Sequence, residues 1–206
     1  MTATRVVTAP YGRLVRGPLS FDDVEELELA AETPEQRRTA AARLVAWSEE
    51  PHPEDDAEVT PAMLLAHAGE LLTTVGDHEA ALDLYRRAAA AEGDVVPDVR
   101  CHLHHGLIAV GDLDAARRLA EEVRRSRPTD ADVYARIGED YEAVGDLVEA
   151  NRWMNLGLRR LIDGIEDPDE APPDVVAALL LTARRRFRQA LGFTPDEFDL
   201  MLPPQR

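Results

Sequence analysis

The feature that most constrains the fold is a Gly-Asp pair that occurs three times in the middle of the chain. Gly76-Asp77, Gly111-Asp112 and Gly145-Asp146 recur at intervals of 35 and 34 residues, and each pair lies between two segments with apolar residues at helical spacing. Glycine can adopt the left-handed conformation that ends a helix, and aspartate can accept hydrogen bonds from the free amides that begin the next one. A repeat of this length predicts a series of helix-turn-helix units.

The second helical segment of each unit carries packing residues at a fixed spacing after the Gly-Asp pair. Small residues would let two helices approach closely, and a larger residue would fill the space between neighbouring units. The three sets are Ala81, Tyr85 and Ala88, then Ala116, Ala120 and Val123, then Ala150, Met154 and Gly157.

With these turns and packing positions, residues 61–162 resemble the tetratricopeptide-repeat family, whose marks also appear on the first helices as Gly69 and Gly138. The resemblance implies an all-α fold, a right-handed superhelical solenoid of helix pairs. The second unit departs from the family pattern, because His104 stands at the close-packing position and Arg100 replaces a large apolar residue. Gly106, two residues further on, is the alternative point of close approach.

The flanking segments are interpreted as caps for the solenoid, since terminal repeats would otherwise expose an apolar face. We divide the chain into a basic arm (1–20), capping helices with an acidic loop (21–60), three repeats (61–162), and an acidic loop with a C-terminal capping helix (163–206). Ser20 and Thr33 are expected to cap the first two helices. In the last region we expect a buried apolar stripe and a final short helix capped by Thr194 with Glu197. That stripe comprises Val176, Leu179, Leu180, Ala183, Phe187, Ala190 and Leu191.

Composition restricts the partners that the chain can bind. Its 206 residues include 40 acidic and 23 basic side chains, which give a formal net charge of −17. Nucleic-acid binding begins with a basic surface, so this balance disfavours it. The longest apolar run, Val175 to Leu181, is far shorter than the ~20 residues that span a bilayer. With one cysteine and no evident signal peptide, we expect a cytoplasmic protein without a membrane partner.

The resemblance places the binding surface on the concave side, which the first helix of each repeat would line. This surface would be acidic, so we expect a protein or peptide ligand that is basic or amphipathic. A family subclass that grips C-terminal carboxylates is disfavoured, because only Arg136 matches its basic and amide positions, while Ala66, Glu70, His102 and Asp132 occupy the others. The alternative is that these carboxylates form an ordinary solvated surface. The expected concave residues are Met63, Ala66, Glu70, Thr73, Thr74, Asp98, Cys101, His105, Ile108, Asp132, Ala135, Arg136, Glu139 and Glu142.

Catalytic motifs are not evident in the sequence, and we expect neither enzyme activity nor a cofactor. The alternative function is a metal-binding or thiol-based site, because Cys101 and His105 lie one helical turn apart. Further ligands would have to come from His67 or Glu70. A structural module that only self-associates remains a third hypothesis.

Two basic segments stand out against the acidic background. The run from Arg184 to Arg188 is expected to pair with local acidic surface, with the loop Asp163 to Asp174 as its partner. The N-terminal arm carries Arg5, Arg13 and Arg16 and no acidic residue. It would either lie extended in its own groove or in that of a second copy, or form a loose or locally packed tail.

Overall fold

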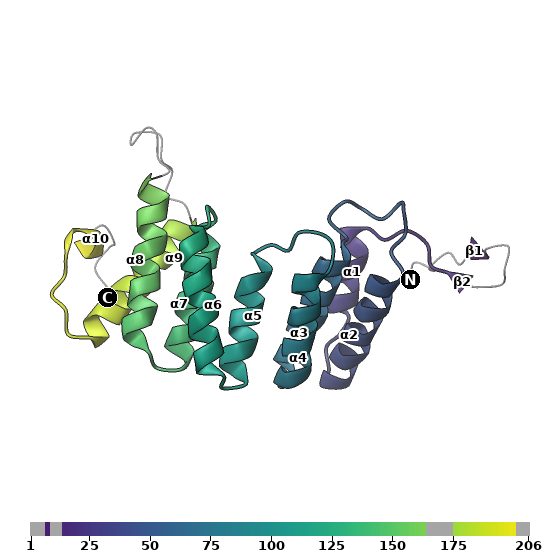
Figure 1. Cartoon of the computed structure of the whole chain (residues 1–206), viewed down its shortest axis with the longest axis horizontal. Helices are drawn as coiled ribbons and strands as arrows, with labels where there is room; N and C mark the ends of the chain where they lie inside the picture. Colours follow the sequence, from purple (N-terminus) through teal and green to yellow (C-terminus); the bar gives the residue numbers. More distant parts are fainter. Residues whose placement is uncertain (1–6, 9–13, 164–174, 201–206) are drawn as a thin grey trace. The chain divides into compact units, whose positions relative to one another are not determined.

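The computed structural model describes residues 7–8, 14–163 and 175–200 of the 206-residue chain (Figure 1). In this part the chain is all-α apart from one short antiparallel pair of strands, so the expected all-α class is confirmed. Val7–Thr8 (β1) pairs with Leu14–Val15 (β2), in a register that places Val7 opposite Val15. None of the described helices is long and apolar enough to cross a membrane.

The chain divides into two compact units, Met1–Gly106 (unit 1) and Leu107–Arg206 (unit 2). Unit 1 contains α1 (Phe21–Leu29), α2 (Pro34–Glu49), α3 (Pro61–Thr74), α4 (His78–Ala90) and most of α5 (Val99–Ala109). Unit 2 contains α6 (Leu113–Ser126), α7 (Ala131–Ala143), α8 (Leu147–Asp163), α9 (Val175–Ala190) and α10 (Glu197–Leu200). Each predicted repeat therefore corresponds to two consecutive helices. The division between the units falls inside α5, the first helix of the second repeat.

The three Gly-Asp turns have one backbone geometry. Gly76, Gly111 and Gly145 have φ angles of 81°, 81° and 77°, and each ends its helix in the left-handed conformation. At the first turn the Gly76 amide donates to the carbonyl of Thr73, and the Asp77 amide donates to that of Leu72. The same two hydrogen bonds recur at the other two turns. This pattern satisfies carbonyls that a helix end would otherwise leave unpaired.

The aspartates of these turns do not all act as the sequence predicts. Asp112 and Asp146 accept hydrogen bonds from the amides of Ala115 and Glu149, at 3.1 Å and 3.2 Å. Asp77 makes no such cap within the described chain, because its carboxylate instead accepts two hydrogen bonds from Arg38 of α2, at 2.7 Å and 3.2 Å. The predicted cap is thus wrong for the first turn, where a cation from a neighbouring helix competes for the carboxylate.

The predicted packing positions on the second helices are all buried. Helices approach closely where glycine faces a large side chain, because a Cβ atom at Gly69 would overlap the ring of Tyr85, and one at Gly138 would overlap Met154. In the second repeat, which departs from the family pattern, a Cβ atom at Gly106 would lie 3.0 Å from Leu82 and 3.1 Å from Tyr85. Gly106 therefore supplies the close approach to α4, as the sequence suggested.

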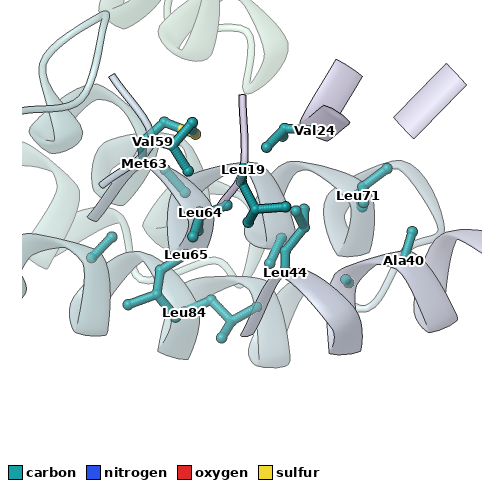
Figure 2. Packing of buried hydrophobic residues seen from close by; sticks show 14 of the residues in the cluster. Leu19, Val24, Ala40, Leu44, Val59, Met63, Leu64, Leu65, Leu71 and Leu84 are labelled. Carbon is teal, nitrogen blue, oxygen red and sulfur yellow. The ribbon is translucent and has the colours of Figure 1, made fainter. Parts of the chain in front are cut away.

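The core of unit 1 joins α1, α2, α3 and α4. Val24, Leu44 and Leu64 are at most 1% exposed and belong to one cluster, whose members converge between the helices in Figure 2. The predicted N-caps of the first two helices are confirmed, since Ser20 and Thr33 both form capping boxes with the third helical residue. These caps fix where α1 and α2 begin, so that their apolar residues face α3.

The end of unit 2 differs from the expected C-terminal cap in two respects. The buried residues of α9 are Leu180, Arg184 and Phe187, whereas Leu179 is 57% exposed and Ala190 is also exposed. The buried stripe is therefore narrower than predicted, and it includes a charged side chain. The last short helix begins at Glu197, so Thr194 is not its cap.

Asp196 takes the place that Thr194 was expected to hold. The Asp199 amide donates to the Asp196 carboxylate at 3.2 Å, and the Asp196 amide donates to the Asp199 carboxylate at 3.0 Å. This reciprocal arrangement is a capping box displaced by two residues from the predicted one.

Candidate functional site

The predicted surface positions on α3 have two different environments. Met63 and Ala66 are 6% and 1% exposed and belong to the core cluster, so they pack inside unit 1 instead of facing a ligand. Thr73 shares a hydrogen bond of 3.0 Å with the hydroxyl of Tyr85. The side chain of Glu70 is 43% exposed and lies 3.4 Å from Nδ1 of His102. Of the five predicted residues on α3, Glu70 is thus the one that offers an open charge, while Thr74 is exposed but uncharged.

Most of the predicted binding residues in α5, and Asp98 just before it, are buried or bound to a neighbouring side chain. Cys101 is 2% exposed, which removes its thiol from any surface contact. Asp98 accepts hydrogen bonds from Arg100, and this guanidinium holds the pKa of the Asp98 carboxyl below its usual value despite partial burial. His105 is exposed. Among its predicted residues, unit 1 therefore offers Thr74 and His105 as exposed side chains and Glu70 as a partly exposed carboxylate.

The exposed face of α7 carries the strongest cluster of predicted binding residues. Asp132, Arg136 and Glu139 are exposed and follow one another at intervals of four and three residues, which places them on one stripe of the helix. Neither a hydrogen bond nor an ion pair engages these three side chains within the described chain, whereas Glu142 accepts a hydrogen bond of 2.6 Å from Arg186. One turn beyond Glu139 the stripe ends at Glu142, whose carboxylate already binds the guanidinium of Arg186.

Glu139 has the most unusual electrostatic environment of this stripe. Although its side chain is exposed on one side, desolvation by the neighbouring chain raises its pKa; Arg136 opposes this effect, while Asp140 and Glu142 reinforce it. A carboxylate whose charge is disfavoured in this way gains more from an added cation than one that is fully hydrated. The stripe Asp132–Arg136–Glu139–Glu142, which we call the α7 stripe, is therefore suited to accept a positively charged group.

The alternative metal site receives no geometric support. Cys101 is buried and His105, one turn away, is exposed. Among the described residues, no group of three or more His, Cys, Asp or Glu side chains is placed to hold a metal ion. His67, one of the proposed further ligands, instead contacts Glu28 of α1 at 2.8 Å.

A hollow of about 370 Å³ lies in unit 2 and is lined by residues of α6, the end of α7, and α8. Its lining includes Arg124 and Arg152, which bind Glu121 at 2.6 Å and Glu149 at 3.2 Å. Cations and carboxylates thus neutralise each other in this lining, and the hollow offers no net charge to a ligand.

Within the described residues, the basic run on α9 binds acids that the sequence did not indicate. Arg184 and Arg188 bind Asp196 and Asp199, which follow them in the chain. The predicted partner, the loop Asp163 to Asp174, lies outside the described residues beyond Asp163. The missed signal was the Asp-x-x-Asp spacing of Asp196 and Asp199, which can cap a short helix and face a guanidinium at once.

The described part of the N-terminal arm is locally packed. Two of its segments pair as β1 and β2, and Arg16 donates to the Asp55 carboxylate at 2.7 Å and 2.5 Å. Arg5 and Arg13 lie outside the described residues. Arg16 is therefore held by the acidic loop of unit 1, as expected for the packed-tail alternative.

Comparisons with known proteins include a distant structural likeness. No protein-family model matches the sequence, and no curated protein matches it. The crystal structure of BtubC (BKLC) from P. vanneervenii is similar with a TM-score of 0.48 and 15% sequence identity, over 83% of this chain and 81% of that chain.

Proposed function

We propose that the chain is an adaptor built from tetratricopeptide-type helix pairs, and that it binds a basic or amphipathic segment of a protein partner through the α7 stripe. The observation that carries this proposal is that three charged side chains of the stripe are exposed and unengaged within the described chain. The repeated turn geometry and the buried packing positions support the repeat assignment, and with it a right-handed solenoid arrangement.

The chemistry of the stripe favours a cation over other ligands. Asp132, Glu139 and Glu142 supply three carboxylates against the single guanidinium of Arg136. Arg186 already binds Glu142 at 2.6 Å, so a guanidinium fits at this end of the stripe. A second guanidinium or ammonium group at Glu139 would offset the burial that raises the pKa of this carboxyl. A partner with two or three basic residues along one face would match this arrangement.

The net charge of −17 supports the same class of partner. Long-range attraction would speed the encounter with a basic segment, and local pairing along the stripe would set its position. Such binding should weaken as salt rises, because ions screen exposed charges beyond about 10 Å at 0.1 M.

Fluorescence anisotropy of the full chain with a labelled basic peptide tests the proposal. The probe is a synthetic peptide of residues 1–18, which carries three arginines among apolar residues, and the control peptide has these arginines changed to glutamate. We expect the Asp132→Asn, Glu139→Gln double variant to bind the basic peptide about 5- to 30-fold more weakly than the wild type. The matched control is Glu122→Gln, an exposed carboxylate on α6, which should leave the affinity unchanged.

Equal affinity for the basic peptide and its glutamate counterpart would refute a charge-selective stripe. A free-energy loss per removed charge that is the same in the α7 double variant, which removes two charges, and in Glu122→Gln, which removes one, would also refute it, since the effect would then come from net charge alone.

A further inference from the structure

We propose that Arg184, Arg188 and Asn155 form a binding site for an acidic peptide with two carboxylates three residues apart. In this structure, residues 191–200 of the chain itself occupy the site, and we define them as the C-terminal latch. The latch would leave when a competing acidic segment binds. This inference is independent of the α7 stripe and of the function proposed for it.

The site is built around a buried guanidinium. Arg184 is 3% exposed, and its Nε donates to Oδ1 of Asn155 on α8 at 2.8 Å, which fixes the plane of the group. Its Nη1 donates to Asp196 and to Asp199, at 2.9 Å each, and its Nη2 donates to Asp196 as well. The ring of Phe198 lies 5.2 Å from the same guanidinium. The geometry is that of paired carboxylate recognition.

A second guanidinium, one helical turn further along α9, completes the site. Nε of Arg188 donates to Asp199 at 2.9 Å, and its Nη2 lies 3.2 Å from Asp196. Nη2 of Arg188 also donates to the backbone carbonyl of Thr194 at 2.7 Å. The two arginines therefore bind both carboxylates and one backbone carbonyl of the latch.

The latch presents its carboxylates in a form that another peptide could copy. The capping box between Asp196 and Asp199 holds both side chains at the start of one helical turn. Any segment with the sequence pattern Asp-x-x-Asp can form this local structure, since the pattern depends on neighbouring residues alone. The recognised element is thus short and portable.

Charge, more than apolar burial, holds the latch. Asp199 is the buried residue of α10, whereas the apolar side chains of Phe193 and Leu200 are 51% and 76% exposed. If the latch opened into solvent with no other segment in its place, Arg184 would stay buried without its carboxylate partners, which is costly. Exchange for another Asp-x-x-Asp segment restores the same hydrogen bonds, so the free-energy cost of exchange is smaller than the free-energy cost of simple opening.

The connection to α9 permits this exchange. Gly192 ends α9 in the left-handed conformation, with a φ angle of 76°. Phe193, Thr194 and Pro195 follow it and are exposed. A change of backbone direction here would move the latch, whose Phe193 and Leu200 side chains are exposed and whose Phe198 ring is partly buried.

The test uses the full chain and a labelled synthetic peptide of residues 191–200 with blocked ends. In the Asp196→Asn, Asp199→Asn double variant the internal latch loses its carboxylates, and we expect the peptide to bind at least about 10-fold more tightly than it binds the wild type. Adding Arg184→Met to this variant should abolish binding. Glu197→Gln, which changes the exposed carboxylate between the two aspartates, is the control and should bind the peptide like the wild type.

A second measurement covers the case in which the double variant does not fold. A fluorine label at Phe193 of the wild-type chain reports the latch by NMR, and unlabelled peptide at about millimolar concentration should shift its resonance toward that of a free segment. A peptide with asparagine in place of both aspartates should not. Two results would overturn the proposal: a label resonance that does not shift when the acidic peptide is added, or a folded double variant that binds the peptide no more tightly than the wild type does. In either case Arg184, Arg188 and their aspartates would serve only to stabilise the fold.

Discussion

The N-terminal end of unit 1 and the C-terminal end of unit 2 are both fastened by an arginine that binds aspartate. Arg16 binds Asp55 at 2.5 Å, with side chains that are 11% and 7% exposed. Arg184 binds Asp199 at 2.9 Å, and both side chains are 4% exposed. The contact chemistry is the same at the two ends, so differences between them must come from what surrounds each ion pair.

The surroundings differ in apolar burial. The Leu19 amide donates to Asp55 of the N-terminal pair, and the Leu19 side chain, 7% exposed, belongs to the core cluster of unit 1 together with Val24, 0% exposed (Figure 2). At the C-terminal end, Phe193 and Leu200 remain exposed. Buried apolar area supplies most of the net stability of a fold, whereas a buried ion pair adds little beyond its desolvation cost. The N-terminal pair therefore closes a core, and the C-terminal pair holds a segment that can exchange.

The largest effect is expected from Asp55→Ala. This carboxylate accepts hydrogen bonds from Arg16 and from the amides of Leu19 and His52, so its loss leaves a partly buried cation and two amides without their partner. We expect the free energy of unfolding to fall by about 3–5 kcal/mol, measured by chemical denaturation. Glu54→Ala, at an exposed position of the same loop, should change it by less than about 0.5 kcal/mol. An Asp199→Ala variant that lost as much global stability as Asp55→Ala would contradict the distinction between the two ends.

Matched truncations of leucine give the next largest effect. Leu19→Ala removes a side chain that is 7% exposed and should cost about 2–5 kcal/mol of unfolding free energy. Leu200→Ala removes one that is 76% exposed and should cost less than about 0.5 kcal/mol. Both variants can be compared by thermal and chemical denaturation. Similar costs at the two positions would show that apolar burial does not separate the ends.

Features that depend on a few neighbouring residues were predictable from the sequence. The Gly-Asp turns follow from the conformational freedom of glycine, and the caps at Ser20 and Thr33 follow from side chains that reach amides three residues away. The packing positions were also found, because their spacing repeats in each unit. These features specify the helices and their pairing, which is most of the fold within each unit.

Features that depend on which distant helices meet were not predictable in the same way. Asp77 was expected to cap α4, but Arg38 lies 39 residues earlier in the chain and takes its carboxylate. Met63 and Ala66 were assigned to a surface, although α1 and α2 supply the core residues that pack with them. The partners of Arg184 were missed for a more local reason, because the sequence did not show that the segment after Gly192 turns back and places Asp196 and Asp199 against α9. Of the candidate site, the α7 stripe was predictable because its spacing is that of a single helix.

The smallest expected effect is a dependence of stability on pH that is confined to the N-terminal end. Burial would lower the pKa of His67, but its hydrogen bond with Glu28, at 2.8 Å, and the charges of Glu28, Glu70 and Glu25 outweigh burial and raise it. A raised pKa means that the folded chain binds the proton more tightly than the unfolded chain does. The stabilisation is complete below the ordinary histidine value of 6.5 and is lost as pH rises through the higher folded value.

The free energy of unfolding of the wild type should therefore decrease as pH rises above 6.5, and His67→Gln should flatten this part of the profile. Glu28→Gln should flatten it too, because it removes the carboxylate that holds the proton on His67. The C-terminal latch should not respond over this range. Arg184 and Arg188 lower the pKa of Asp196, and any stabilisation linked to that carboxyl is lost only as pH falls below its ordinary value of 3.8. Hydrogen exchange of residues 19–29 and 191–200, followed across neutral pH, separates the two ends. Two results would contradict this difference between the ends: the same pH dependence of the unfolding free energy in His67→Gln as in the wild type, or faster opening of residues 191–200 as pH rises over the same range.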